Sequence, residues 1–144
     1  IEETFQIRAS LEELAVSLAT PRLDEKDLNE IESLLRRADT ALTQGEREQS
    51  SAFGAQFHQY FIQRADNRRL VTILSGLDDR LKCFRRISDL ITGRLEKSRK
   101  QHQQVFEAVC QGDAKRAGRA MYSHWQSVLK DIKETSDERL WDKQ

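Results

Sequence analysis

Proline, glycine and cysteine are all scarce in this sequence. Proline occurs once, glycine six times and cysteine twice among 144 residues. Proteins built from sheets use many turns rich in glycine and proline, and few segments here alternate between apolar and polar residues, so we do not expect a sheet protein. The chain is rich in Leu, Ala, Glu, Arg and Lys. That composition is typical of a helical bundle with a solvated outer face.

The two cysteines, Cys83 and Cys110, form no CxxC pair. Because no secretory signal is present, we expect free, partly buried thiols and no disulfide. No apolar run approaches the roughly 20 residues of a membrane span. The sequence therefore predicts a soluble cytoplasmic protein. It starts inside a helical pattern without an initiator Met, so we expect a piece of a longer chain.

A net charge is absent as well, since 24 Lys and Arg residues balance 24 Asp and Glu residues. A surface that binds DNA neutralises several phosphates and usually makes its own domain basic. The arginine pairs at 36–37, 68–69 and 85–86 are dispersed among acidic residues, as on ordinary helix faces. We therefore do not expect this chain to bind DNA by itself.

Apolar residues at helical spacing predict an all-α fold, a single antiparallel bundle of about six helices with short connections. The inward stripes are expected to include Leu14 and Ile73. Gly112 suits a left-handed residue after a helix, and Asp113 suits the N-cap of the next one. The expected helices run from near Glu2 to about Ala19, from the capping box of Asp24 and Asp27 to about Leu42, from about Glu48 to Ala65, through Leu70 to Ile87, from about Arg94 to Gln111, and from Asp113 almost to the C-terminus.

Each of the three histidines lies on an apolar helix stripe. His58 shares its helix face with Phe61 and Ile62, and the stripes beside His102 and His124 are equally apolar. One interpretation is three separate core histidines, each hydrogen-bonded to a neighbour, and for any one of them alone it is the better one. The other is a single metal ion shared by all three.

Taken together, the three positions favour one shared metal ion and three separately hydrogen-bonded histidines equally. An unpaired buried polar group costs roughly 1–3 kcal/mol, and one ion satisfies all three rings because neutral imidazole binds Zn, Ni, Cu or Fe well. Three protein ligands with an open position describe a site that accepts water or a carboxylate.

Several motifs occur in a specific order along nearly the whole chain. They are Arg8-x-x-Leu11-Glu12, Phe57-His58, Asn67-x-x-Leu70, Arg94-x-x-x-Ser98-x-x-x-His102, Ala108-x-x-x-Gly112-Asp113-x-x-x-Ala117 and Met121-x-x-His124. In combination they resemble the C-terminal domain of the FadR branch of GntR-type transcriptional regulators. The resemblance implies an all-α antiparallel bundle that forms a homodimer and binds a small organic acid.

A metal-binding subgroup of that family uses three histidines and one aspartate. The histidines carry over onto His58, His102 and His124, whereas the aspartate position, four residues before His58, is Gly54 here. The resemblance therefore implies a divalent metal such as Zn or Ni, held by three neutral ligands with at least one further open position. Without the aspartate, direct contact between the histidines and the effector stays open as well.

Intact family members carry an N-terminal winged helix-turn-helix domain. No such segment occurs in this sequence, so the resemblance implies that residues 1–144 form the ligand-binding sensor domain. DNA would be contacted only through the absent domain, and the domain itself would not be an enzyme.

The same resemblance suggests which side chains hold the acid. Its carboxylate would complete the metal coordination, and Arg8, Arg94 and Ser98 are the candidate ligand-binding residues. Ser98 and His102 share a helix face one turn apart. From the residues alone, Arg8 is expected to form an exposed salt bridge with Glu12. Arg94 is explained equally well as a ligand contact or as an exposed residue in the first turn of its helix.

Two other classes of function stay open. A hydrolytic enzyme with a three-histidine metal site would need a general acid or base, and no carboxylate shares the histidine faces. A purely structural dimerisation module would use an aromatic patch of Tyr122, Trp125 and Trp141 on the last helix. A specific small acid should stabilise a sensor and leave a structural module unchanged.

Overall fold

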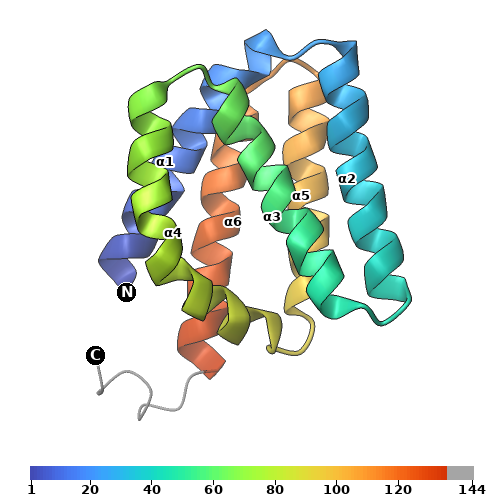
Figure 1. Cartoon of the computed structure of the whole chain (residues 1–144), viewed down its shortest axis with the longest axis vertical. Coiled ribbons are helices and arrows are strands. Elements are labelled where there is room, and N and C mark those ends of the chain that lie inside the picture. The colour runs from blue at the N-terminus through green and yellow to red at the C-terminus, as the bar shows by residue number, and fades with distance from the viewer. Residues whose placement is uncertain (136–144) are drawn as a thin grey trace.

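The computed structural model describes residues 1–135, which contain six α-helices, one short 3-10 helix and no strand. Successive α-helices run in opposite directions (Figure 1). The prediction of a six-helix all-α bundle is therefore confirmed for the described residues. Trp141 and the predicted extension of the last helix toward the C-terminus lie outside them. The elements are α1 (Glu2–Ala19), η1 (Thr20–Arg22), α2 (Glu25–Thr43), α3 (Arg47–Arg64), α4 (Arg68–Asp89), α5 (Arg94–Cys110) and α6 (Ala114–Thr135).

Local side-chain chemistry fixes the helix starts where the sequence predicted them. Asp24 and Asp27 form a reciprocal capping box at the start of α2, which satisfies two backbone N–H groups that no helix bond can reach. Asn67 caps α4 by accepting from the Leu70 amide at 3.0 Å. Gly112 has a left-handed φ of 69°, and Asp113 accepts from the Arg116 amide. Of these caps, the one at Asp113 begins the helix that carries His124.

The close approach of α1 and α6 depends on Gly118. A Cβ atom built at this position would lie 2.4 Å from the Ser17 hydroxyl oxygen and 3.0 Å from the Glu13 carbonyl oxygen. Any larger residue would therefore push the two helices apart. The main core cluster lies beside this contact and includes Phe5 from α1 with Trp125 from α6.

Several positions differ from the sequence-based prediction. Leu14 and Ile73 were expected to face inward, but their side chains are 42% and 51% exposed. They lie on α1 and α4, at the edge of the bundle, where the apolar stripe is wider than the contact between the helices and part of it stays uncovered.

Cys83 and Cys110 are both free and exposed, so the expectation of partly buried thiols was wrong. Trp125 is buried in the core and does not belong to an outer aromatic patch.

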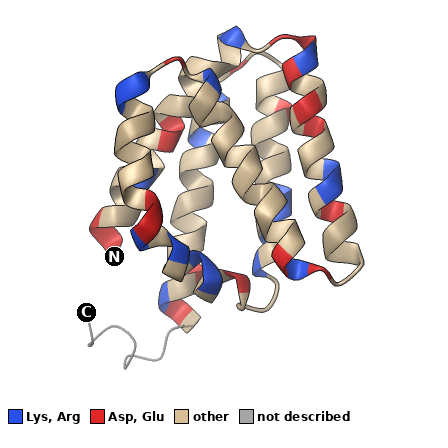
Figure 2. Ribbon diagram, in the orientation of Figure 1, with Lys and Arg blue, Asp and Glu red and all other residues tan. Residues whose placement is uncertain are grey.

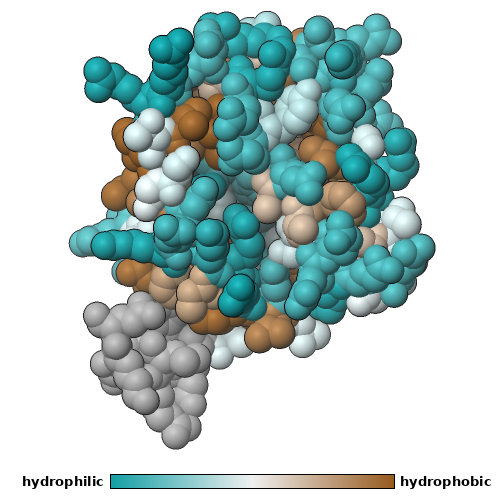
Figure 3. Space-filling model, viewed as in Figure 1, coloured by the Kyte–Doolittle hydropathy of each residue, from teal (hydrophilic) through white to brown (hydrophobic). Residues whose placement is uncertain are grey.

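The ribbons carry both signs of charge, as the balanced composition predicted. Figure 2 shows basic and acidic residues on most helices, with several basic ones close together toward the end of α4. Figure 3 shows a mainly hydrophilic face with hydrophobic residues exposed along the side where α4 lies. Among the described residues, none of the helices combines the length and the apolar character that crossing a membrane requires.

Candidate functional site

The three histidines meet at one point inside the bundle. His58 comes from α3, His102 from α5 and His124 from α6, and each is at most 6% exposed. The Nε2 atom of His102 lies 3.0 Å from Nε2 of His58 and 3.4 Å from Nε2 of His124. One ligand atom from each ring lies within 4.8 Å of the others. The rings therefore turn the same kind of nitrogen toward a common centre.

These separations suit a metal with tetrahedral coordination. Two nitrogens that each lie about 2.0–2.1 Å from a tetrahedral zinc are about 3.4 Å apart, close to the distances between the imidazoles here. Burial also favours the neutral form of two of the rings, the form in which imidazole binds a metal. It lowers the pKa of His102 and of His124 well below the usual value, and the neighbouring imidazoles add to the effect.

A buried ion pair supports His58 from behind. Its Nδ1 atom donates to Oε1 of Glu12 at 2.5 Å, and the other oxygen of Glu12 accepts from Nε of Arg8, also at 2.5 Å. Burial opposes ionisation of Glu12, but the charges and hydrogen bonds of His58 and Arg8 outweigh it and lower its pKa to about 2. When the His58 ring is neutral, the carboxylate holds its one N–H on Nδ1 and leaves the lone pair on Nε2.

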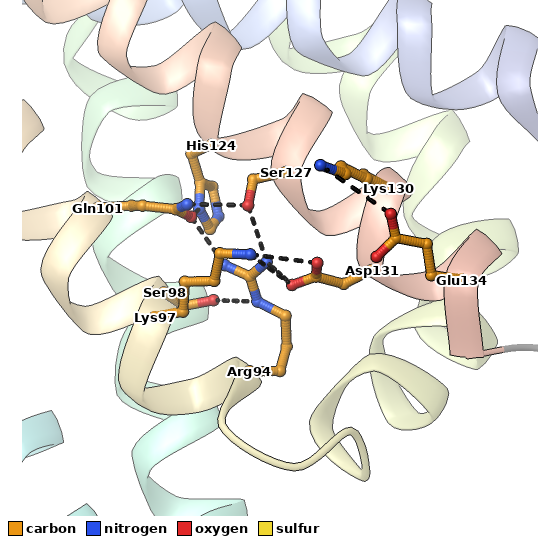
Figure 4. Close-up of polar contacts among 9 residues, drawn as sticks. All are labelled: Arg94, Lys97, Ser98, Gln101, His124, Ser127, Lys130, Asp131 and Glu134. Atoms are coloured by element: carbon orange, nitrogen blue, oxygen red, sulfur yellow. Dashed lines mark hydrogen bonds and ion pairs between the residues drawn. The ribbon is translucent and has the colours of Figure 1, made fainter.

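An amide performs the same task for His124 (Figure 4). Nδ1 of His124 donates to Oε1 of Gln101 at 2.7 Å, and Nη2 of Arg94 donates to that same oxygen at 2.7 Å. The Gln101 amide donates in turn to the Ser127 hydroxyl at 2.9 Å. This orientation of Gln101 leaves its oxygen as the acceptor, so the Nε2 atom of His124 carries the lone pair that faces the centre.

His102 has no such support. Its Nδ1 atom is buried and has no hydrogen-bond partner. Gly54 lies beside it, and a Cβ atom at that position would be 3.5 Å from Cε1 and 4.0 Å from Nδ1 of His102. Gly54, at the position where the resemblance implied an aspartate, thus leaves room for a side-chain atom on this side of the cluster.

A cavity of about 80 Å³ opens on that side. Its wall is formed by α3, α4, α5 and α6 with Phe5 of α1, and all three histidines contribute to it. Such a volume holds several water molecules or a small organic molecule. The polar residues of its lining other than histidine are Ser50, Ser51, Arg85, Ser88, Asp89, Ser98, Arg99 and Trp125.

The predicted ligand-binding residues divide between the cavity and its surroundings. Ser98 lines the cavity, whereas Arg8 and Arg94 lie outside its wall. Every nitrogen of the Arg94 guanidinium donates to a protein oxygen, one of them to Asp131 at 2.6 Å. Arg8 donates to Glu12, to the Leu74 carbonyl and to Asp78. Both arginines are buried, whereas the residues alone suggested an exposed salt bridge for Arg8 and an exposed first-turn residue for Arg94.

Sequence reasoning missed four residues of the site: Glu12, Gln101, Arg99 and Trp125. Glu12 was counted only as a salt-bridge partner of Arg8, and Gln101 gave no signal. A cue existed for Arg99, because a residue three positions before His102 lies on the same helix face.

Comparisons with known proteins agree with this fold. The FCD domain model matches residues 3–127. The HTH-type transcriptional regulator YdhC of Bacillus subtilis is 25% identical over 139 residues, which are 96% of this chain and 62% of that protein. The chain thus spans about three fifths of the length of this curated relative.

Two solved structures share the architecture. E. coli McbR/YncC matches with a TM-score of 0.84 at 21% identity, over 94% of this chain and 68% of that one. Streptococcus agalactiae GntR matches with a TM-score of 0.74 at 20% identity, over 89% and 57% of the two chains. At such identities these likenesses show the fold, whereas the family model covers most of the sequence. The chain therefore belongs to the FCD domain family, the C-terminal domain of GntR-family regulators.

Proposed function

We propose that this domain senses a small organic acid at a metal ion held by His58, His102 and His124. The observation that carries the proposal is the convergence of three Nε2 atoms at separations of 3.0 and 3.4 Å beside an open cavity. Three core histidines with separate roles would not need to turn the same nitrogen toward one point. The supports of His58 and His124 orient those nitrogens as ligands.

The donor set fits a divalent transition metal such as Zn or Ni. When bound, the ion supplies a Lewis-acidic centre with at least one position open to an oxygen of the acid. The protein's own contribution is to favour neutral imidazoles at His102 and His124, to orient two of the three rings through Glu12 and Gln101, and to leave the side next to Gly54 clear. A cavity of about 80 Å³ limits the acid to a few carbon atoms.

The proposal assigns DNA binding to another part of a longer regulator. Lys and Arg balance Asp and Glu in this chain, and its relative YdhC is described as an HTH-type transcriptional regulator. Binding of the acid changes DNA affinity only if it favours one arrangement of the bundle over another. The helices that line the cavity are the elements whose arrangement would change in such a shift.

A homodimer forms part of the same proposal. Ile7 and Leu14 lie two turns apart on α1 and are 49% and 42% exposed, and Ile73 on the adjacent α4 is 51% exposed. Exposed apolar residues on neighbouring helices are typical of contact surfaces. Light scattering tests this part, because a monomeric mass at micromolar concentration contradicts it.

The decisive experiment is the metal content of the purified domain, measured alongside His102→Ala. We expect about one equivalent of a divalent metal in the parent protein and its loss in the variant, because two imidazoles alone bind far more weakly. Gln103→Ala is the matched control, since Gln103 lies next to His102 on α5 but is exposed. It should retain the metal.

Circular dichroism must show that His102→Ala keeps its helical content, so that metal loss reports on the site. The metal-loaded parent should then gain thermal stability with a short carboxylic acid. If the parent domain takes up no metal after incubation with Zn, Ni and Mn, the proposal is wrong.

A further inference from the structure

Three buried hydrogen-bond donors or acceptors without partners belong to residues of the cavity wall. They are Nη1 of Arg99, Nε1 of Trp125 and Nδ1 of His102. Their residues are 7%, 7% and 4% exposed. An unpaired buried polar group costs roughly 1–3 kcal/mol, and the described residues contain no other such side-chain atom. The three residues that carry these atoms all line the cavity beside the histidines, and Trp125 also borders a second pocket between α1 and α6.

We propose that Arg99 and Trp125 bind the acid directly, Arg99 to its carboxylate and Trp125 to a second oxygen group. The inference rests on the proposed function and names the residues that select the ligand. A short dicarboxylate is the class of molecule that satisfies both donors. The resemblance predicted that Arg8 or Arg94 binds the carboxylate. The inference assigns this role to Arg99, which lies outside the motifs that carry the resemblance.

The local geometry of Arg99 suits an anion. Its Nε atom donates to Oδ1 of Asp39 at 2.5 Å, which holds the guanidinium in place from the α2 side. Asp39 itself is 59% exposed, so this ion pair is partly hydrated and leaves the buried Nη1 edge available. A planar guanidinium can engage one carboxylate with one edge and a second with the other.

The charge of the wall points the same way. The lining contains Arg85 and Arg99 against a single acid, Asp89. Asp89 already accepts a hydrogen bond from the Ser51 hydroxyl at 2.5 Å, and burial raises its pKa. A cavity with an excess of cationic side chains attracts anions.

Trp125 supplies the second contact from a different helix. It comes from α6, whereas Arg99 comes from α5, and its indole N–H can only donate. A ligand that bridges the two must carry two acceptor groups. Arg99 also lies one helical turn before His102, with a Cβ separation of about 5–6 Å, so the carboxylate bound to Arg99 lies beside the histidine cluster.

Isothermal titration of the zinc-loaded domain with succinate and with butyrate tests the inference. The two acids have the same number of carbons, but butyrate lacks the second carboxylate. We expect succinate to bind at least about tenfold more tightly, the value of one hydrogen bond to a charged group. Arg99→Gln should lose about tenfold or more in succinate affinity, and Trp125→Phe should lose several-fold while retaining the aromatic packing on Phe5.

Asp39→Asn separates an anchoring role from a structural one. It removes the ion-pair partner of Arg99 but leaves the guanidinium, so succinate affinity should stay the same or rise. If Arg99 matters only through its bond to Asp39, both variants destabilise the fold equally and neither changes succinate affinity. Arg36→Gln, at an exposed position on α2, is the control and should bind as the parent does.

The outcomes distinguish this inference from the proposed function. Unchanged succinate affinity in Arg99→Gln, with the zinc content retained, overturns the anchor and leaves the acid sensor intact. Equal affinity for butyrate and succinate in the parent overturns the bifunctional ligand. A zinc-loaded parent that binds neither acid overturns the proposed function together with the inference.

Discussion

The two sides of the histidine cluster differ in how far the protein completes them. On one side, the Nδ1 atoms of His58 and His124 donate to Glu12 and Gln101, and each of these acceptors is held by a buried arginine. On the other side, Nδ1 of His102 has no partner. The first side we call the supported side, defined by Glu12 and Gln101 with their two histidines. The second is the open side, defined by His102, Gly54 and the cavity.

This difference distinguishes the part of the site that is held rigidly from the part that can bind a ligand. A buried group that the protein satisfies fully holds its orientation, whereas one left unsatisfied gains free energy when a ligand arrives. The supported side therefore fixes the direction of two imidazoles before any ligand enters. The open side keeps its donors for a ligand, and this division favours a binding site over three unrelated core histidines.

The supported side is not uniform, because one support is charged and the other neutral. Glu12 is an ionised carboxylate that is 1% exposed and forms an ion pair with Arg8. Gln101 is a neutral amide in a network that also contains Ser127. Removing one partner of a buried ion pair leaves an uncompensated charge, so the two supports should differ in their effect on stability.

The largest effect is expected for Glu12→Ala. This variant leaves Arg8 buried with only Asp78 as a charged partner, and a broken buried pair costs about 3–5 kcal/mol of unfolding free energy. Chemical denaturation measures it, with the exposed Glu3→Ala as the control. The double variant Arg8→Met with Glu12→Leu should cost less than Glu12→Ala alone. If Glu12→Ala loses less than about 1 kcal/mol of unfolding free energy, this pair contributes no more than an ordinary surface ion pair.

The pKa of Glu12 gives this prediction its pH dependence. The pKa in the folded protein is about 2, below the ordinary value of 4.5. The ionised carboxylate therefore stabilises the fold above about pH 4.5, and this contribution is lost as the pH falls from 4.5 toward 2. Glu12→Gln should show a flatter pH profile of unfolding in that window.

Much of the architecture could be predicted from the sequence because its causes are local. The capping box of Asp24 and Asp27 and the turn at Gly112 depend on residues within a few positions of one another. The inward direction of His58, His102 and His124 follows from the helical period. These features need no knowledge of how the helices pack.

The supports of the histidines could not be predicted, because they depend on packing between distant segments. Glu12 meets His58 across 46 positions, and Gln101 meets His124 across 23. The polar residues on the faces of α1 and α5 look like solvated ones in the sequence. The packing of α1 on α3 and of α5 on α6 brings these side chains into the interior.

A smaller effect is expected for Gln101→Met, which tests the neutral half of the supported side. Methionine has a similar length but does not accept from His124, so the ring loses its fixed orientation. Loss of such a support typically lowers metal affinity by about 10–100-fold. Competition with a chelator measures this affinity. Gln101→Glu keeps an acceptor and should retain it, and Gln104→Met at an exposed position of α5 is the control. Equal metal affinity in Gln101→Met and the parent would show that the amide does not orient His124.

The smallest effect, and the one that most directly tests the difference between the two sides, is expected for Gly54→Asp. A Cβ atom fits at this position at ordinary contact distance from His102, and the new carboxylate lies one turn from His58 on the same helix face. An anionic ligand on the open side should raise metal affinity on the order of tenfold and weaken acid binding by a similar factor, because it takes the place of the acid. Gly54→Asn adds the same volume without charge, so it should leave metal affinity nearly unchanged and separate filling of the space from coordination. If Gly54→Asp weakens the metal and leaves acid binding intact, the space beside Gly54 is not where the acid approaches the histidines, and the open side must be sought elsewhere in the cavity wall.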